Sequence, residues 1–95
     1  MSEAPTVHHD REGHQFQTVV DGHRAYLAYM DLGKQTLDIY RTFVPNELRG
    51  RGIAAVLAEH ALAFAEREGY TVIPSCSYVE SYLERRQRQE APADD

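Results

Sequence analysis

The segment Arg-Gly-Arg-Gly at positions 49–52 combines residue types that can hold an anion. It follows a β-branched and aromatic run, residues 36–44, and precedes a long amphipathic run, residues 53–68, which predicts the order strand, turn, helix. The first N–H groups of a helix have no intrahelical partners and carry a partial positive charge, so a helix start binds phosphate groups. The glycines leave the backbone open to a ligand, and the arginines add positive charge beside it.

A glycine-bearing turn is weak evidence by itself. On the turn alone, a ligand loop and an ordinary strand-to-helix turn with exposed arginines are equally good interpretations. The spacing does exclude two other phosphate loops. Ala55 stands at the third glycine position of a dinucleotide fingerprint, and the Gly-Lys-Ser/Thr of a P-loop does not follow.

Two segments of the chain resemble motifs of one enzyme superfamily. The pattern Arg49-x-x-Gly52-x-Ala54, which opens a predicted helix after a predicted strand, is similar to the Arg/Gln-x-x-Gly-x-Gly/Ala signature of the GCN5-related N-acetyltransferases. About twenty residues later, positions 73–79 read Ile-Pro-Ser-Cys-Ser-Tyr-Val, which resembles a motif of the small single-domain members of that superfamily. The resemblance covers residues 15 to about 86, so it involves most of the chain.

This resemblance implies a bound cofactor, acetyl-coenzyme A. Its pyrophosphate would lie on the loop amides, its pantetheine arm along the end of the strand at residues 36–44, and its thioester between that strand and the one at residues 70–74. The cofactor-binding residues implied in this way are Val44, Arg49, Gly50, Arg51, Gly52, Ile53, Ala54, Ser75 and Tyr78.

Three side chains are candidates for catalysis. Cys76 has three interpretations: an acyl-accepting nucleophile, with its pKa lowered by a following helix start, a residue that lines the thiol end of the cofactor, or a small buried hydrophobic residue. The resemblance places Tyr82 near a tyrosine that protonates the departing CoA thiolate in larger relatives, although a packed aromatic is an equally good interpretation. Larger relatives also carry a general-base glutamate on the strand at residues 36–44; this chain has none there, which leaves a water or Asp38 as the substitute.

Length and composition limit the classes of protein that fit. Ninety-five residues predict one domain, which we assign to residues 1–89, followed by an acidic disordered tail at residues 90–95. A net charge of -5 argues against a nucleic-acid binder. No apolar run approaches the roughly 20 residues of a membrane span, and the polar start lacks a signal peptide, so we expect a cytoplasmic protein. One cysteine and five histidines without metal-ligand spacing predict no metal site.

The pattern of apolar residues and turns predicts an α+β fold with a mixed sheet. A four-stranded antiparallel meander comes first, followed by the cofactor-binding helix, a parallel fifth strand at residues 70–74 and a short final helix. Turns are expected at residues 21–22 and 31–34, and the strand at residues 24–30, apolar on both faces, should be central. Simple alternation along the fourth strand puts Leu37, Ile39, Arg41 and Phe43 on one face and Asp38, Tyr40, Thr42 and Val44 on the other.

Three hypotheses for function follow. The leading one is transfer of an acetyl group from coenzyme A to an unidentified amine, on a small molecule or a protein, either directly or through Cys76. The alternative is a non-catalytic acyl-CoA-binding or regulatory module, which the missing glutamate favours. The third is an interaction domain whose arginines pair with an acidic partner. The acceptor and the oligomeric state are not encoded in any pattern that we find.

Overall fold

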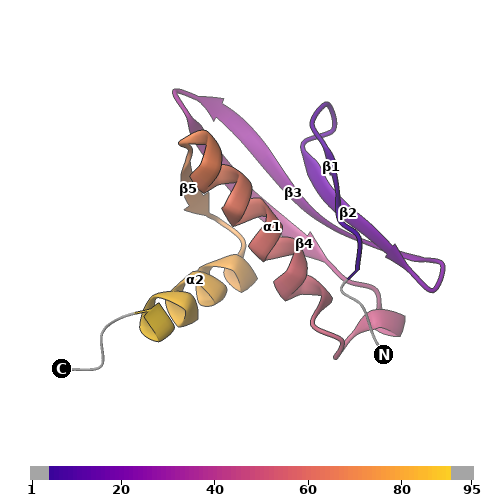
Figure 1. The fold of residues 1–95 in the computed structure, drawn as a ribbon. Helices are drawn as coiled ribbons and strands as arrows, with labels where there is room; N and C mark the ends of the chain where they lie inside the picture. Colours follow the sequence, from indigo (N-terminus) through magenta and orange to yellow (C-terminus); the bar gives the residue numbers. More distant parts are fainter. Residues whose placement is uncertain (1–4, 91–95) are drawn as a thin grey trace.

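The chain forms a five-stranded sheet in the order β1-β2-β3-β4-β5, together with helices α1 and α2 (Figure 1), in a computed structural model that describes residues 5–90. The elements in chain order are β1 (His8–Asp10), β2 (Gln15–Val20), β3 (His23–Gly33), β4 (Thr36–Phe43), the single turn η1 (Asn46–Leu48), α1 (Ile53–Glu68), β5 (Thr71–Pro74) and α2 (Ser77–Glu90). The mixed α+β fold predicted from the sequence is confirmed, with β3 at the centre of the sheet.

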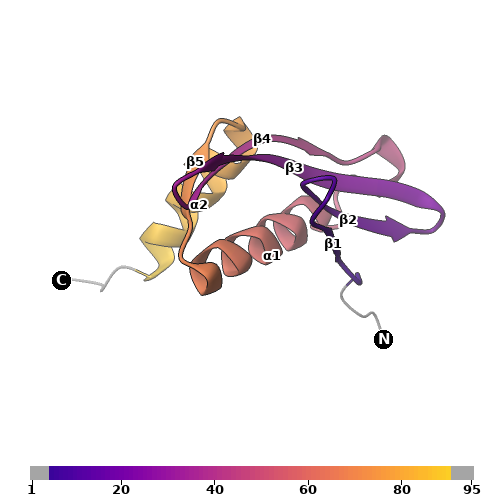
Figure 2. The ribbon, with the colours of Figure 1, turned by 90° about the horizontal axis from the view of Figure 1, so that it is seen from above.

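The sheet changes direction of pairing only at its last strand. β1 to β4 pair antiparallel in chain order, and β5 pairs parallel to β4 from Thr36↔Thr71 to Ile39↔Pro74. Figure 2 shows α1 lying along one face of the sheet, as a helix that connects two parallel strands must. β4 and β5 stop pairing after Ile39 and Pro74, so the end of β4 is free to border a ligand site.

Turn geometry follows the sequence at one hairpin and departs from it at the other. Asp21 and Gly22 both have positive φ, 53° and 80°, as predicted for the turn between β2 and β3. The turn expected at residues 31–34 lies later, because β3 continues to Gly33 and the residues with positive φ are Gly33, Lys34 and Gln35.

A β-bulge in β4 overturns the predicted faces of that strand. Tyr29 pairs with Ile39 and Ala28 with Arg41, so Tyr40 has no partner on β3. Beyond the bulge the alternation of side chains reverses. Ile39 is buried against α1, whereas Phe43 is exposed and its ring lies 5.6 Å from that of Tyr26.

The reversal also separates two residues that simple alternation places together. Asp38 lies before the bulge and pairs with Met30, which is exposed on the face away from α1. Val44 lies beyond the bulge and packs against the core beneath α1. The prediction that Asp38 and Val44 share a face is therefore wrong, and one extra residue in the strand is the reason.

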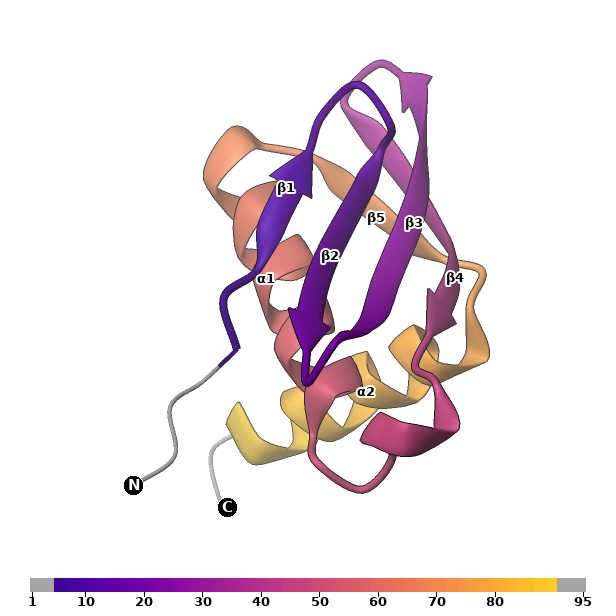
Figure 3. The ribbon, with the colours of Figure 1, turned by 90° about the vertical axis from the view of Figure 1, so that its right-hand side faces the viewer.

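The core lies between the sheet and α1 and is closed at one end by α2. Leu27, Ile39, Leu57 and Val79, from β3, β4, α1 and α2, are among the side chains with almost no exposed surface. Figure 3 shows that the beginning of α1, α2 and the β2–β3 turn lie at one end of the sheet, and the end of α1 and the β3–β4 turn at the other. The fold therefore presents two separate ends.

Some expectations concern features outside this core. No helix among residues 5–90 is long and apolar enough to cross a membrane. The same residues contain no group of three or more His, Cys, Asp or Glu side chains placed to hold a metal ion. Of the tail predicted at residues 90–95, only Glu90, with which α2 ends, is among the described residues.

Candidate functional site

The loop between β4 and α1 has a backbone that only glycine adopts readily. Pro45 ends the strand, and the turn η1 buries Leu48, which is 1% exposed and fixes the loop to the core. Gly50 and Gly52 follow with φ of 83° and 75°. A Cβ added at either glycine meets nothing within 4 Å, so both positions face open space that a ligand can occupy.

Helix α1 begins without a side-chain cap. Its N-cap is Gly52, which has no side chain to accept a hydrogen bond, and the first helical bond runs from Val56 N to Gly52 O at 3.1 Å. Among the described residues, the amides of Ile53, Ala54 and Ala55 therefore have no acceptor. Unpartnered amides at the positive end of a helix suit a phosphate or pyrophosphate group.

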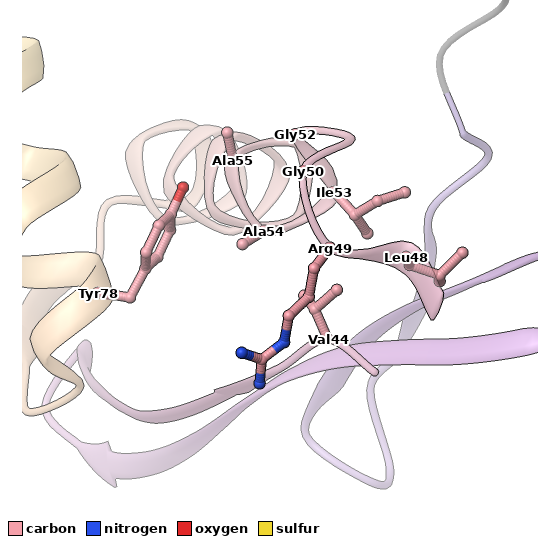
Figure 4. Close-up of a pocket in the computed structure, with 9 residues that line it drawn as sticks. All are labelled: Val44, Leu48, Arg49, Gly50, Gly52, Ile53, Ala54, Ala55 and Tyr78. Atoms are coloured by element: carbon pink, nitrogen blue, oxygen red, sulfur yellow. The ribbon is translucent and has the colours of Figure 1, made fainter. Parts of the chain in front are cut away.

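These amides border a cavity of about 340 Å³ between the loop, the end of β4 and the start of α2 (Figure 4). Its lining residues are Val44, Leu48, Arg49, Gly50, Gly52, Ile53, Ala54, Ala55 and Tyr78. Seven of the nine cofactor residues inferred from the sequence lie here. Leu48 and Ala55 were not predicted. For Leu48, the sequence does contain a signal, because an apolar side chain in an otherwise polar turn indicates a buried position.

The two arginines of the loop have different environments. Figure 4 shows the Arg49 side chain extending from the loop into the space beside Val44. The Arg49 amide donates to Asn46 O at 3.2 Å, but within residues 5–90 the Arg49 side chain has no hydrogen bond or ion pair. Arg51 does not line the cavity, and its Nη1 donates to Oδ2 of Asp21 at 2.8 Å. The charge available to a ligand in this arrangement is therefore that of Arg49.

Cys76 is near the cavity but not in its wall. Its amide donates to Ile39 O at 2.9 Å, and its thiol donates to Thr42 Oγ1 at 3.5 Å, which fixes it between the separating ends of β4 and β5. Burial raises the pKa of the thiol, but hydrogen bonds from the Thr42 side chain and nearby backbone groups outweigh burial and lower the pKa below its ordinary value. Ser75, which precedes it, is exposed and also outside the cavity wall.

Of the two tyrosines on α2, only Tyr78 reaches the cavity. Figure 4 shows its ring opposite Ala54 and Ala55 on α1. Tyr82 lies behind it, with ring centroids 6.3 Å apart, and does not line the wall. Burial, followed by the charge of Glu59, raises the pKa of Tyr82, so its hydroxyl stays protonated at neutral pH.

Asp38 has an unusual environment. Its Oδ1 is buried and has no hydrogen-bond partner, although burial without a partner is costly for a carboxylate oxygen. The residue lies one pair before the point where β4 and β5 separate, on the face away from α1. Asp38 and Val44, which lines the cavity, are therefore on opposite faces of the sheet.

Comparison with known proteins agrees with this geometry. The model of the GCN5-related N-acetyltransferase family matches residues 15–91, and the chain belongs to that family. Protein NATD1 from Xenopus tropicalis is 40% identical over 79 residues, which cover 81% of this chain and 72% of the frog protein. Protein NATD1 from Homo sapiens is also 40% identical over 79 residues, covering 81% of this chain and 70% of the human protein.

The fold has a solved counterpart. The solution structure of a GCN5-like protein from Staphylococcus aureus superposes with a TM-score of 0.69, covering 92% of this chain and 85% of that protein at 21% sequence identity. Family members generally use acetyl-CoA as cosubstrate. The residues present here fit that group, because the unpartnered amides of Ile53, Ala54 and Ala55 are the donors that a pyrophosphate accepts from.

Proposed function

We propose that this protein binds acetyl-CoA in the cavity at the start of α1 and transfers the acetyl group to an amine. One observation carries the proposal: the amides of Ile53, Ala54 and Ala55 are unpartnered and share a cavity with the guanidinium of Arg49. A diphosphate satisfies both kinds of donor at once, through the helix start and through a charge-assisted hydrogen bond. The amides of Gly50 and Gly52 extend the same surface.

Acetyl-CoA supplies an activated acetyl group as a thioester. In a direct route, the unprotonated amine attacks the thioester carbonyl, CoA leaves as a thiolate, and the amine loses a proton. In a two-step route, the thiolate of Cys76 first takes the acetyl group and releases CoA, and the amine then takes it from Cys76. The lowered pKa of Cys76 and its fixed position at the open ends of β4 and β5 favour the second route.

Two further residues have assigned roles in this proposal. The phenol of Tyr78 lines the cavity, and it or Tyr82 behind it gives the proton that the departing CoA thiolate requires. Asp38 accepts a proton from the amine on the other side of the sheet, where its buried Oδ1 has no partner in the described chain. The acceptor, a small molecule or a protein, then approaches from the face that α1 leaves open.

A non-catalytic acyl-CoA-binding module is the second candidate. It is favoured by the position of Asp38, which is the only acidic residue of β4 and lies on the face opposite Val44. CoA release that depends on an added amine separates the two candidates. In a set of amines with acetyl-CoA, thiol release by any one of them supports transfer, and release by none supports the binding module.

The remaining parts of the proposal concern the chain as a whole. We assign residues 1–89 to one acetyltransferase-like domain and residues 90–95 to an acidic tail. We further place the protein in the cytoplasm, where acetyl-CoA is available, with an amine acceptor rather than nucleic acid as its partner.

Calorimetric titration with acetyl-CoA tests the binding step. Gly52→Ala puts a methyl group where the diphosphate is proposed to lie, and Gly33→Ala is the matched control, because both glycines have positive φ and open space around the added Cβ. The strain of roughly 1–2 kcal/mol from the left-handed backbone is common to both variants. Loss of binding in Gly52→Ala alone supports the proposal, whereas equal binding by the two variants contradicts it.

Mass spectrometry tests the covalent route separately. Incubation with acetyl-CoA should add one acetyl group to the protein, and Cys76→Ser should abolish that adduct. An adduct that survives in Cys76→Ser rules out Cys76 as the acceptor and leaves the direct route.

A further inference from the structure

A second cavity, of about 240 Å³, lies at the other end of the sheet from the cofactor loop. Residues from the β1–β2 turn, the end of β3, the start of β4 and the end of α1 line it, and Figure 3 shows these segments converging at the end away from α2. Leu37, in its wall, is the second residue of β4, whereas Val44 in the first cavity follows the last. The two cavities are therefore separate sites.

Opposite charges face this cavity without pairing to each other. Arg11 and Asp31 both line it, and neither forms an ion pair within the part of the chain that the structure describes. Asp31 Oδ1 accepts from Gly33 N at 2.9 Å, so one carboxylate oxygen remains available. A cation and an anion that line one cavity without pairing are the complement of a ligand that carries both charges.

Aromatic rings form much of the rest of the wall. The guanidinium of Arg11 lies 5.1 Å from the centre of the Phe64 ring, which in turn stacks on Tyr70 at 5.7 Å. Stacking on Phe64 orients the fork of Arg11, and a planar guanidinium held in this way is suited to a bidentate carboxylate. The rings also offer a surface to an apolar or aromatic side chain.

One polar group in the wall is almost fully buried. Tyr29 is 5% exposed, and its hydroxyl lies 2.7 Å from His9 Nε2. A phenol both donates and accepts, so the bond to His9 leaves it able to make one more hydrogen bond. The ring of His14, 5.2 Å from that of Tyr29, adds another polar side chain to the lining.

We propose that this cavity binds a small zwitterion, a free α-amino acid, with its carboxylate on Arg11 and its ammonium group on Asp31. The side chain of the ligand then lies against Phe64 and Tyr70. A simple anion leaves Asp31 unpaired, and a simple amine leaves Arg11 unpaired, so each binds more weakly than the zwitterion. The site is independent of acetyl-CoA binding, and its test does not involve acetyl transfer.

The experiment compares three probes that share a phenyl group. L-phenylalanine carries both charges, 3-phenylpropionate only the carboxylate, and 2-phenylethylamine only the ammonium group. Each is titrated to about 10 mM into the whole ¹⁵N-labelled protein, with amide shifts as the readout. We expect saturable shifts around Tyr29, Phe64 and Tyr70 with L-phenylalanine, and affinity at least roughly tenfold weaker for the other two probes. Equal affinity for either single-charge probe, or no saturable shift with L-phenylalanine, overturns the proposal.

Two variants test the pairing of charges. Arg11→Gln and Asp31→Asn should each weaken L-phenylalanine binding roughly tenfold, and Asn at position 31 keeps an oxygen for the Gly33 amide. Arg24→Gln is the matched control, because Arg24 is also exposed and lies over an aromatic ring, 4.8 Å from the centre of Tyr26, away from this cavity. The amide spectra report whether each variant is folded. Unchanged affinity in a folded Arg11→Gln protein contradicts the assignment.

Discussion

The sulfur of Cys76 and the hydroxyl oxygen of Thr42 lie 3.5 Å apart, where β4 and β5 separate. This contact joins the segment before α2 to the last part of β4. It also opposes the rise in the thiol pKa that burial causes, because the Thr42 hydroxyl can donate to a thiolate. The contact between Cys76 and Thr42 depends on the β4 bulge, which turns Thr42 toward the face that α1 covers.

Replacing Thr42 by valine should raise the pKa of Cys76. Valine has nearly the same shape but no hydroxyl, so burial is unchanged and one stabilising hydrogen bond to the thiolate is lost. The pH profile of alkylation by iodoacetamide should therefore shift to higher pH. Thr71→Val, at the exposed start of β5, is the control and should leave the profile in place. A profile that does not move in Thr42→Val contradicts the role of this hydroxyl.

The two loop arginines should contribute unequally to acetyl-CoA binding. Arg49→Gln removes a guanidinium that lines the cavity and has no protein partner in the described chain, so affinity should fall about tenfold or more. Arg51→Gln removes a guanidinium engaged by Asp21 at an exposed site, so a smaller loss is expected. Calorimetric titration with acetyl-CoA measures the affinity of both variants. A larger effect at Arg51 would show that its pair with Asp21 opens when the ligand binds.

The free energy of unfolding should decrease in mild acid because of His9. Burial, followed by the charge of Arg11, lowers the pKa of His9 below 6.5, and its ring stacks on Phe16 at 4.0 Å. The unfolded chain therefore binds more protons than the folded one as pH falls below 6.5. The contribution of His9 to the free energy of unfolding is full above that pH and is lost as pH falls toward the lowered pKa.

Urea unfolding between about pH 7.5 and 5 measures this effect. His9→Gln should be less stable at neutral pH, because the stacking is lost, but its stability should depend less on pH. The control is His60→Gln, at an exposed position on α1, which should keep the dependence of the unmodified protein. If His9→Gln and the unmodified protein have the same pH dependence, His9 is not the group responsible.

Truncation of a buried side chain on α1 should lower the free energy of unfolding substantially. Leu57 has no exposed surface and packs beneath the sheet, so Leu57→Ala should lower the free energy of unfolding by about 2–5 kcal/mol. Val19 on β2 is 64% exposed, and Val19→Ala should change stability by only about 0.5 kcal/mol. Chemical unfolding of both variants measures the two changes in the free energy of unfolding. Similar losses at the two positions would mean that α1 does not form the main core.

The elements on either side of the loop at residues 49–52 were predictable because their signals are local. Helix α1 (Ile53–Glu68) coincides with the amphipathic run at residues 53–68 and ends before Gly69, whose left-handed backbone caps the helix. The glycines of the loop also have the positive φ that their residue type allows. These features depend on periodicity and backbone conformation over a few residues, which a sequence displays directly.

What the sequence did not display depends on pairing between distant segments. The β4 bulge at Tyr40 is fixed by its register with β3, and no residue type near it signals an extra residue. The pairing of Arg51 with Asp21 joins positions thirty residues apart. The cavity between Arg11 and Asp31 likewise exists only once β1, β3 and α1 are packed together.

The most direct test of the account is the amide spectrum of the labelled protein during titration with acetyl-CoA. We predict saturable shifts at Gly50, Gly52, Ile53, Ala54 and Ala55, whose N–H groups have no acceptor within residues 5–90, and little change at the far cavity around Tyr29. If these amides stay unmoved at millimolar acetyl-CoA, the helix start does not hold the pyrophosphate, and the proposed function is wrong.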